Sequence, residues 1–430
     1  MVGAALVMSF VVAYGLFSKY LAKTPITGPM LFVVLGVLAG PEALNVVSLP
    51  LTDDVVQTVL EMTLVIVLFT DAAVIDVAAV RRHLTIPTRL LTVGLIGTMA
   101  AGIALAAAMF GELGFWGAAV VAVTLAPTDA ALGQAVVTND MVPGAVRQGL
   151  SVESGLNDGI AVPFLSIAIA GVAGEMTTGT GLVSLFLEEL GVAIVVGLAV
   201  GYAGGKLVVL CYQRGWMSRE WRQMLVPVIA VLCFLVATTL HGSGFIAAFV
   251  GGLVFGNLVR EKYPDICTLS EALAYLLTIL SFLLFGALIF GPRISAITWE
   301  IVVYALASLT VVRLIPVGLA MFRAKVALPT VAFLGWFGPR GIASLVFAGT
   351  VVAEVDPTAT ELTLTIVSTT VALSVLLHGV TAWPLSIMYG RWVSNMDHDE
   401  DAGEMQEPAD IATRNRVTPA RDAGTRGTGV

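Results

Sequence analysis

Residues 124–130 read Thr-Leu-Ala-Pro-Thr-Asp-Ala and interrupt a long apolar run. A second polar stretch follows one helix later, at residues 153–159, which read Glu-Ser-Gly-Leu-Asn-Asp-Gly. The apolar runs on both sides of each stretch are long enough to enter a bilayer. An unpaired aspartate at that depth costs about 2.5–3.5 kcal/mol on the insertion scale. A chain that keeps such groups uses them to handle an ion or a proton, so Asp129 and Asp158 are the first functional candidates.

The composition is typical of a polytopic α-helical membrane protein. Of the 430 residues, 57% are hydrophobic and 12% are charged, whereas soluble domains carry about 25% charged residues. The apolar residues form long blocks and not the alternating segments of a β-barrel. The net charge of −8 comes without a basic block, so no nucleic-acid partner is expected. Cys211, Cys233 and Cys267 match no metal or disulfide pattern, so we expect them to be packing residues and expect no cofactor.

Thirteen apolar runs predict transmembrane helices, because about 20 residues span the hydrocarbon layer. The first run has no positively charged leader and no small-residue cleavage site, so we interpret it as a helix and not as a signal peptide. The runs cover residues 2–20, 26–48, 55–77, 88–110, 113–137, 145–172, 182–212, 223–240, 243–259, 268–290, 298–322, 328–352 and 361–389.

The charges between these runs predict the orientation. Basic residues cluster in the odd-numbered loops, while the even-numbered loops hold only Arg293 and are mostly acidic. By the positive-inside rule, the odd loops and the C-terminus face the cytoplasm of a cell (inner) membrane and the N-terminus lies outside. The odd-loop cations are Lys19, Lys23, Arg81, Arg82, Arg89, Arg147, Arg214, Arg219, Arg222, Arg260, Lys262, Arg323 and Lys325.

The chain divides into two parts. Residues 1–393 are expected to form the membrane domain. Residues 394–430 are polar, lack apolar periodicity and cannot build a core, so they predict a disordered cytoplasmic tail.

Two of the predicted helices are interrupted by proline. Pro127 breaks the fifth, next to Asp129, and Pro339 breaks the twelfth, next to Arg340. Proline removes a backbone donor and clashes with the preceding turn, so the freed backbone groups need partners inside the protein. Interrupted helices in corresponding positions of two inverted repeats indicate a transporter site near the membrane midplane.

The sixth predicted helix carries the remaining oxygen ligands. A spacing of four puts Ser154 and Asp158 on one face, and Glu153 and Asn157 on the neighbouring face. Asp129 lies on the preceding helix, which a short connection places alongside. Carboxylates, a hydroxyl and free carbonyls form a hard site that suits Na⁺. Burial and a like-charged neighbour also favour protonation of carboxylates, so one site can hold either the cation or a proton.

The other ionisable residues in the apolar runs leave alternatives open. Glu153 is the natural partner of Arg340, but Arg313 could instead pair with Glu153 or neutralise a free carbonyl end. Asp71 on the third helix is deep enough to be an additional cation ligand. His241 and His378 lie near helix ends, where hydrogen-bonded interfacial histidines are expected and proton sensing is the alternative.

Together these motifs resemble the NhaP-type sodium/proton antiporters of the monovalent cation:proton antiporter family. The likeness covers residues 20–390. Its matching segments are residues 25–28 with Gly36, Gly40 and Pro41, then residues 126–129, 153–159, 242–245, 256–257 and 337–341.

The resemblance implies a homodimer of 13-helix subunits, each with a dimerisation part and a six-helix core containing crossed, interrupted helices. It implies Na⁺ ligation by Asp129, Asp158, Ser154 and the Thr128 carbonyl, with Asn157 holding the Thr128 turn. It further implies a structural ion pair of Glu153 with Arg340. The pair Asn157-Asp158 resembles the electroneutral branch. Relatives often carry Glu where this chain has Asp71, and the shorter side chain reaches less far.

The leading interpretation is therefore a secondary antiporter, not an enzyme, that exchanges Na⁺ or Li⁺ for H⁺ one for one in pH homeostasis. A K⁺/H⁺ antiporter of the same fold is the alternative. A passive ion channel and an intramembrane hydrolase using His241 and Ser243 are the other classes considered. The hydrolase would leave the interrupted helices and buried aspartates unexplained.

Overall fold

The computed structural model describes residues 2–21, 24–47, 54–75, 85–129, 132–137, 139–174, 179–355 and 357–396. Across these residues all regular structure is helical, as predicted. Most of the predicted tail, from residue 397 onward, and the loop residues Lys23, Arg81 and Arg82 lie outside the described residues.

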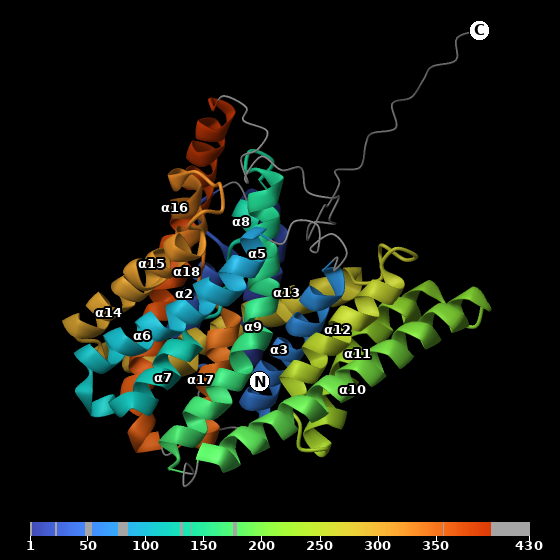
Figure 1. Ribbon diagram of the computed structural model, residues 1–430, viewed down its shortest axis with the longest axis horizontal. Helices are drawn as coiled ribbons and strands as arrows, with labels where there is room; N and C mark the ends of the chain where they lie inside the picture. The colour runs from blue at the N-terminus through green and yellow to red at the C-terminus, as the bar shows by residue number, and fades with distance from the viewer. Residues whose placement is uncertain are drawn as a thin grey trace.

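The described helices form a bundle in which most lie side by side (Figure 1). Their bounds are α1 Val2–Leu21, α2 Gly28–Ala39, α3 Asp54–Val74, α5 Thr85–Arg89, α6 Leu95–Met109, α7 Gly114–Thr124, α8 Gln134–Val137, α9 Gly144–Val172, α10 Gly179–Gln213, α11 Arg219–Thr239, α12 Gly244–Val259, α13 Thr268–Leu284, α14 Trp299–Leu309, α15 Val311–Ala320, α16 Leu328–Trp336, α17 Ile342–Glu354 and α18 Pro357–Ser394. Two π-helical turns, Leu90–Gly94 and Phe285–Phe290, continue α5 into α6 and extend α13.

Each of the thirteen predicted runs contains a helix within the described residues. Eight helical segments are long and apolar enough to cross a membrane, and five shorter apolar helices complete the set. The second helix is shorter than predicted because both of its ends are capped. Thr27 Oγ1 accepts from the Met30 amide at 3.4 Å before its first turn, and the Gly40 amide donates to Gly36 O at its end.

Small residues allow the helices at one edge of the bundle to pack closely. A side chain at Gly252 or Gly256 of α12 would collide with the backbone of α3 at Phe69 or Ala73. Such contacts replace the hydrophobic driving force that is missing between helices in lipid.

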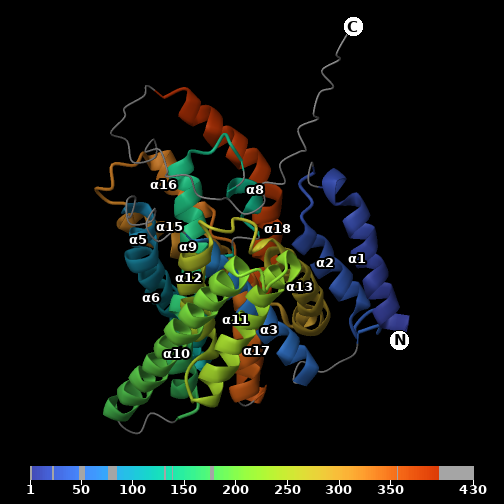
Figure 2. The same ribbon diagram turned by 90° about the vertical axis from the view of Figure 1, so that its right-hand side faces the viewer.

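At the other edge α1 lies beside α2 (Figure 2), and Tyr14 of α1 reaches Tyr275 of α13 with an O–O distance of 2.6 Å.

Contacts between loops agree with the predicted alternation of odd and even loops. Arg89 Nη1 donates to Ala320 O at 2.9 Å, and Arg260 Nη1 donates to Val74 O at 3.2 Å, so residues flanking odd-numbered loops meet. In the even set, Arg293 pairs with Glu361 at 2.8 Å. None of these three contacts joins an odd-numbered loop to an even-numbered one.

Candidate ion-binding site at the crossing of two interrupted helices

The two predicted helix breaks are confirmed, and they meet. Helix α7 ends at Thr124, after which the chain runs without regular structure to Asp129. Helix α16 ends at Trp336, and α17 resumes at Ile342. The Asp129 amide donates to Pro339 O at 2.8 Å, so the two unwound segments are joined by a backbone hydrogen bond.

Side chains from the second broken helix satisfy the carbonyls freed at the end of α7. Ser344 Oγ donates to Thr124 O at 2.7 Å. Arg340 Nη1 donates to Ala126 O at 2.6 Å and to Pro127 O at 3.3 Å. A cation at this position opposes the partial negative charge of a helix C-terminus, and the bonds meet the requirement that buried backbone groups be paired.

The carboxylate of Asp129 lies at the N-terminal end of a half-helix, whereas Arg340 lies at a C-terminal end. Its Oδ2 accepts from the Ile342 amide, in the first turn of α17, at 2.9 Å. The negative group thus lies at the positive end of a 13-residue half-helix. Gly341 permits this approach, because a side chain there would collide with the Asp129 carboxylate.

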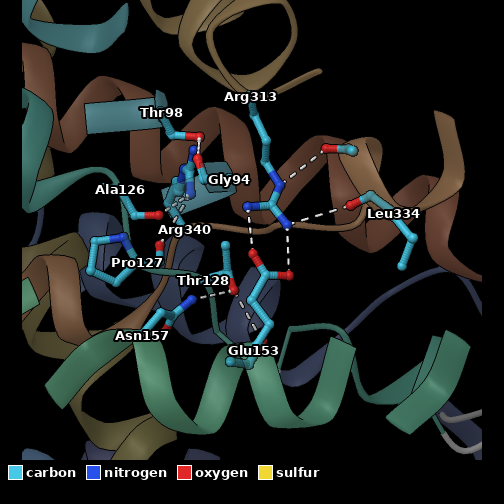
Figure 3. A network of polar contacts seen from close by, with 12 residues as sticks. Gly94, Thr98, Ala126, Pro127, Thr128, Glu153, Asn157, Arg313, Leu334 and Arg340 are labelled. Atoms are coloured by element: carbon cyan, nitrogen blue, oxygen red, sulfur yellow. Dashed lines mark hydrogen bonds and ion pairs between the residues drawn. The ribbon is translucent and has the colours of Figure 1, made fainter. Parts of the chain in front are cut away.

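Helix α9 contributes the groups that face this crossing (Figure 3). Asn157 Nδ2 donates to Thr128 Oγ1 at 2.7 Å, and Ser154 Oγ lies 3.1 Å from the same hydroxyl. The first contact is the one that the resemblance implied for Asn157. Thr128, Ser154 and Asn157 are all buried.

Asp158 is the carboxylate with an open coordination position. It is 6% exposed, and its Oδ1 has no hydrogen-bond partner in the part of the chain that the structure describes. Its charged neighbours are Asp129 and Asp71, which are both acidic. Asp129 and Asp71 are thus near enough to act on the charge of Asp158, and Oδ1 of Asp158 is able to accept a proton or ligate a cation.

Glu153 pairs with Arg313 and not with Arg340, so the Arg340 pairing was wrong. Arg313 makes two parallel contacts with the Glu153 carboxylate, each of 2.9 Å, and both side chains are almost fully buried. Arg313 Nε also donates to Gly335 O at 3.1 Å. Both open alternatives for Arg313 are therefore realised in one residue, which pairs with Glu153 and neutralises a carbonyl end (Figure 3).

The interfacial position expected for His378 was also wrong. His378 lies in the middle of α18 and is 1% exposed, whereas His241 is exposed at a turn. Sequence reasoning missed Ser344, Ser374 and His378 as partners of the broken helices. Their signal was a polar side chain inside an apolar run, which has to find a partner in the bundle.

Two of the three cysteines, Cys233 and Cys267, pack in the hydrophobic core, as expected. Cys211, Cys233 and Cys267 are free thiols, and the last two are buried. Within the described residues, His, Cys, Asp and Glu side chains form no cluster of three that could hold a metal ion.

Two interrupted helices that cross beside buried carboxylates define a class, the helical membrane transporters with discontinuous helices. Comparison with known proteins narrows this class. The family described as sodium/hydrogen exchanger, transmembrane, matches residues 6–387. The chain therefore belongs to the sodium/hydrogen exchanger family.

Individual relatives are more distant. The chain is 26% identical over 322 residues to the K(+)/H(+) antiporter NhaP of Alkalimonas amylolytica, covering 74% of this chain and 55% of the relative. It is 25% identical over 260 residues to a Na(+)/H(+) antiporter of Schizosaccharomyces pombe, covering 56% of this chain and 55% of the relative. The chain thus spans about half the length of these two curated relatives.

The fold has a close structural counterpart. The sodium proton antiporter MjNhaP1 from Methanocaldococcus jannaschii matches with a TM-score of 0.75 at 20% identity, covering 91% of this chain and 99% of that chain. At this identity the match establishes the fold alone.

Proposed function

We propose that the protein exchanges Na⁺ or Li⁺ for H⁺ by competition at Asp129 and Asp158, one for one. The observation that carries the proposal is the pairing pattern of the charges. Glu153 is neutralised by Arg313, and Asp129 is held at the α17 N-terminus, whereas Asp158 Oδ1 has no hydrogen-bond partner among the described residues. Asp158 then offers an oxygen at which cation and proton can replace each other, with Asp129 as the second carboxylate of the site.

The ligand set follows from the same geometry. Ser154 and Thr128 lie within 3.1 Å of each other through their hydroxyl oxygens, on the two segments that carry Asp158 and Asp129. A hydroxyl, carboxylates and a backbone carbonyl are ligands that suit a hard cation. Asp71 is near enough to Asp158 to act on its charge, and we assign it to the same site.

Potassium is the alternative cation. A K(+)/H(+) antiporter is among the relatives with the broadest coverage of this chain, and an all-oxygen site selects by cavity size and rigidity, which ligand types do not specify. The exchange chemistry is the same for either ion, so the choice of cation is a separate proposal from the site.

The test is proton flux in proteoliposomes that contain the full chain, with Na⁺, Li⁺ and K⁺ gradients applied in turn. We expect Na⁺ or Li⁺ to drive proton movement at a rate that does not change with an imposed membrane potential. Competition also predicts that the half-saturating cation concentration rises as the pH falls, because each bound proton removes a cation ligand. A potential-dependent rate would contradict one-for-one exchange, and unitary currents in a planar bilayer would indicate a channel.

We also propose that the protein works as a homodimer in a cell membrane, as the NhaP resemblance implies. Light scattering of the purified protein in detergent, corrected for bound detergent, should give twice the mass of the 44.9 kDa chain. A single-chain mass that persists in lipid nanodiscs would contradict the dimer.

A further inference from the structure

Helix α18 contacts the break of the twelfth helix at several atoms. His378 Nε2 lies 2.8 Å from Trp336 O, the last carbonyl of α16. Ser374 Oγ, one turn earlier on α18, accepts from the Arg340 amide at 2.7 Å. Trp336 Nε1 donates to Thr381 Oγ1 at 3.0 Å. The unwound residues 337–341 are therefore bonded to α18 at both of their ends.

The imidazole of His378 lies between two carbonyl oxygens. Its Nε2 is 2.8 Å from Trp336 O, and its Nδ1 is 2.9 Å from Ser374 O and 3.2 Å from Ser374 Oγ. A carbonyl oxygen can only accept, so the contact of Nε2 with Trp336 O is a hydrogen bond that Nε2 donates. His378 and Ser374 thus connect Trp336 O with the Arg340 amide across the break.

We propose that Ser374 and His378 are positioning residues for the cation site. The segment that they hold supplies Pro339 O to the Asp129 amide and the Ile342 amide to the Asp129 carboxylate, at 2.8 Å and 2.9 Å. Neither residue touches the site oxygens directly. They fix the segment against which Asp129 is aligned, so their loss displaces Asp129 and weakens cation binding.

Ser374 and His378 are buried, so the loss of one of their hydrogen bonds is costly. Ser374 is 0% exposed and His378 is 1% exposed. Inside a membrane no water replaces a lost partner, so removal of the imidazole leaves Trp336 O unpaired. Other buried α18 hydroxyls differ, because Ser386 Oγ and Thr370 Oγ1 donate only to carbonyls of their own helix, Ala382 O and Ile366 O.

The experiment uses the length of the side chain at position 378. Glutamine places an N–H near the position of Nε2 and can still donate to Trp336 O, whereas asparagine reaches only as far as Nδ1. We expect His378→Asn and His378→Leu to raise the half-saturating cation concentration in proteoliposomes roughly fivefold or more, the size expected for one lost buried hydrogen bond. His378→Gln should stay within about twofold of the unmodified protein.

Ser374 has a matched control on the same helix. Ser374→Ala should raise the half-saturating concentration, and Ser386→Ala, which removes an equally buried hydroxyl, should not. A merely structural role would lower the yield or stability of all these variants without separating glutamine from asparagine. Equal half-saturation for the three His378 variants, or no change in any of them, would overturn the proposal.

The inference rests on the proposed cation exchange, so a second measurement is independent of transport. Amide hydrogen exchange of residues 337–342 in detergent should be faster in His378→Leu and Ser374→Ala than in Ser386→Ala. Unchanged amide exchange of these residues would overturn the proposal that Ser374 and His378 hold the segment, whatever the transport rates are. If the unmodified protein moves no protons but the variants show faster amide exchange, the proposed function is overturned. The role of Ser374 and His378 in holding the segment is then still supported.

Discussion

At the scale of single residues, three charges at the broken helices lie against a partial charge of opposite sign. Arg340 lies on the carbonyls that follow α7, Arg313 contacts the last carbonyls of α16, and Asp129 accepts an amide of α17. Charges at helix ends contribute up to about 2 kcal/mol when partly buried. The interrupted helices thus have partners for their ends, and the cost of the buried charges is offset.

The Glu153–Arg313 pair allows a test of this residue-scale account. Removing one partner of a buried pair leaves an uncompensated charge and costs about 3–5 kcal/mol. We expect Glu153→Leu and Arg313→Met each to lower the thermal stability of the detergent-solubilised protein strongly. The double variant should be more stable than the two single losses added together. Strictly additive losses, measured by scanning fluorimetry, would show that the pair is not coupled.

The sequence indicated Asp129, Asp158 and Asn157 as candidates for the site, because a polar side chain inside an apolar run has few possible explanations. It did not predict which arginine pairs with Glu153. That choice depends on the distance between helices far apart in the chain, and spacing along one helix carries no such information. Spacing also did not show that His378 lies in the interior, because the partners of a mid-helix polar residue belong to other helices.

At the scale of elements, the two breaks create half-helices whose ends converge. Pro127 and Pro339 lie at the two breaks, as predicted, since proline removes a backbone donor. Proline alone does not set a break, because Pro163 and Pro384 lie inside the continuous helices α9 and α18. The lengths of the helices were less predictable. Capping shortens α2 to Gly28–Ala39, and α18 continues to Ser394, beyond the apolar run that predicted it.

Glycine at the start of α17 provides the element-scale test. In Gly341→Ala the added methyl group would collide with the Asp129 carboxylate, so the half-helix and the carboxylate have to separate. We expect this variant to fold and to bind the cation about tenfold more weakly, because Asp129 is displaced. A tenfold loss corresponds to about 1.4 kcal/mol of binding free energy.

Gly349 on the same helix is the matched control. A methyl group there meets only Leu60 Cδ1 at 3.7 Å, an ordinary contact. Gly349→Ala should therefore bind the cation normally, as measured by cation-dependent thermal stabilisation. Equal affinities for the two variants would mean that the contact between Asp129 and α17 is not needed for binding.

At the scale of the whole molecule, the alternation of loop charges predicts a single orientation. The contacts of Arg89 and Arg260 show that segments next to the third, ninth and eleventh loops lie together, and sidedness relative to the cell is a further prediction. A fluorescent protein fused to the C-terminus should mature in the cytoplasm, and a cysteine placed near residue 2 should react with an impermeant thiol reagent from outside. Labelling from the cytoplasmic side alone would contradict this topology.

The central claim is that cation and proton compete at the site formed by Asp129 and Asp158. It is tested most directly by Na⁺-driven proton movement in everted vesicles or proteoliposomes that contain Asp158→Asn, beside the unmodified protein and Asp129→Asn. The amide keeps the size of the side chain and removes its charge and its proton. We predict that both variants fold, shown by a monodisperse size-exclusion profile, and that neither moves protons in response to Na⁺, Li⁺ or K⁺. Cation-driven proton movement retained by Asp158→Asn would contradict the account.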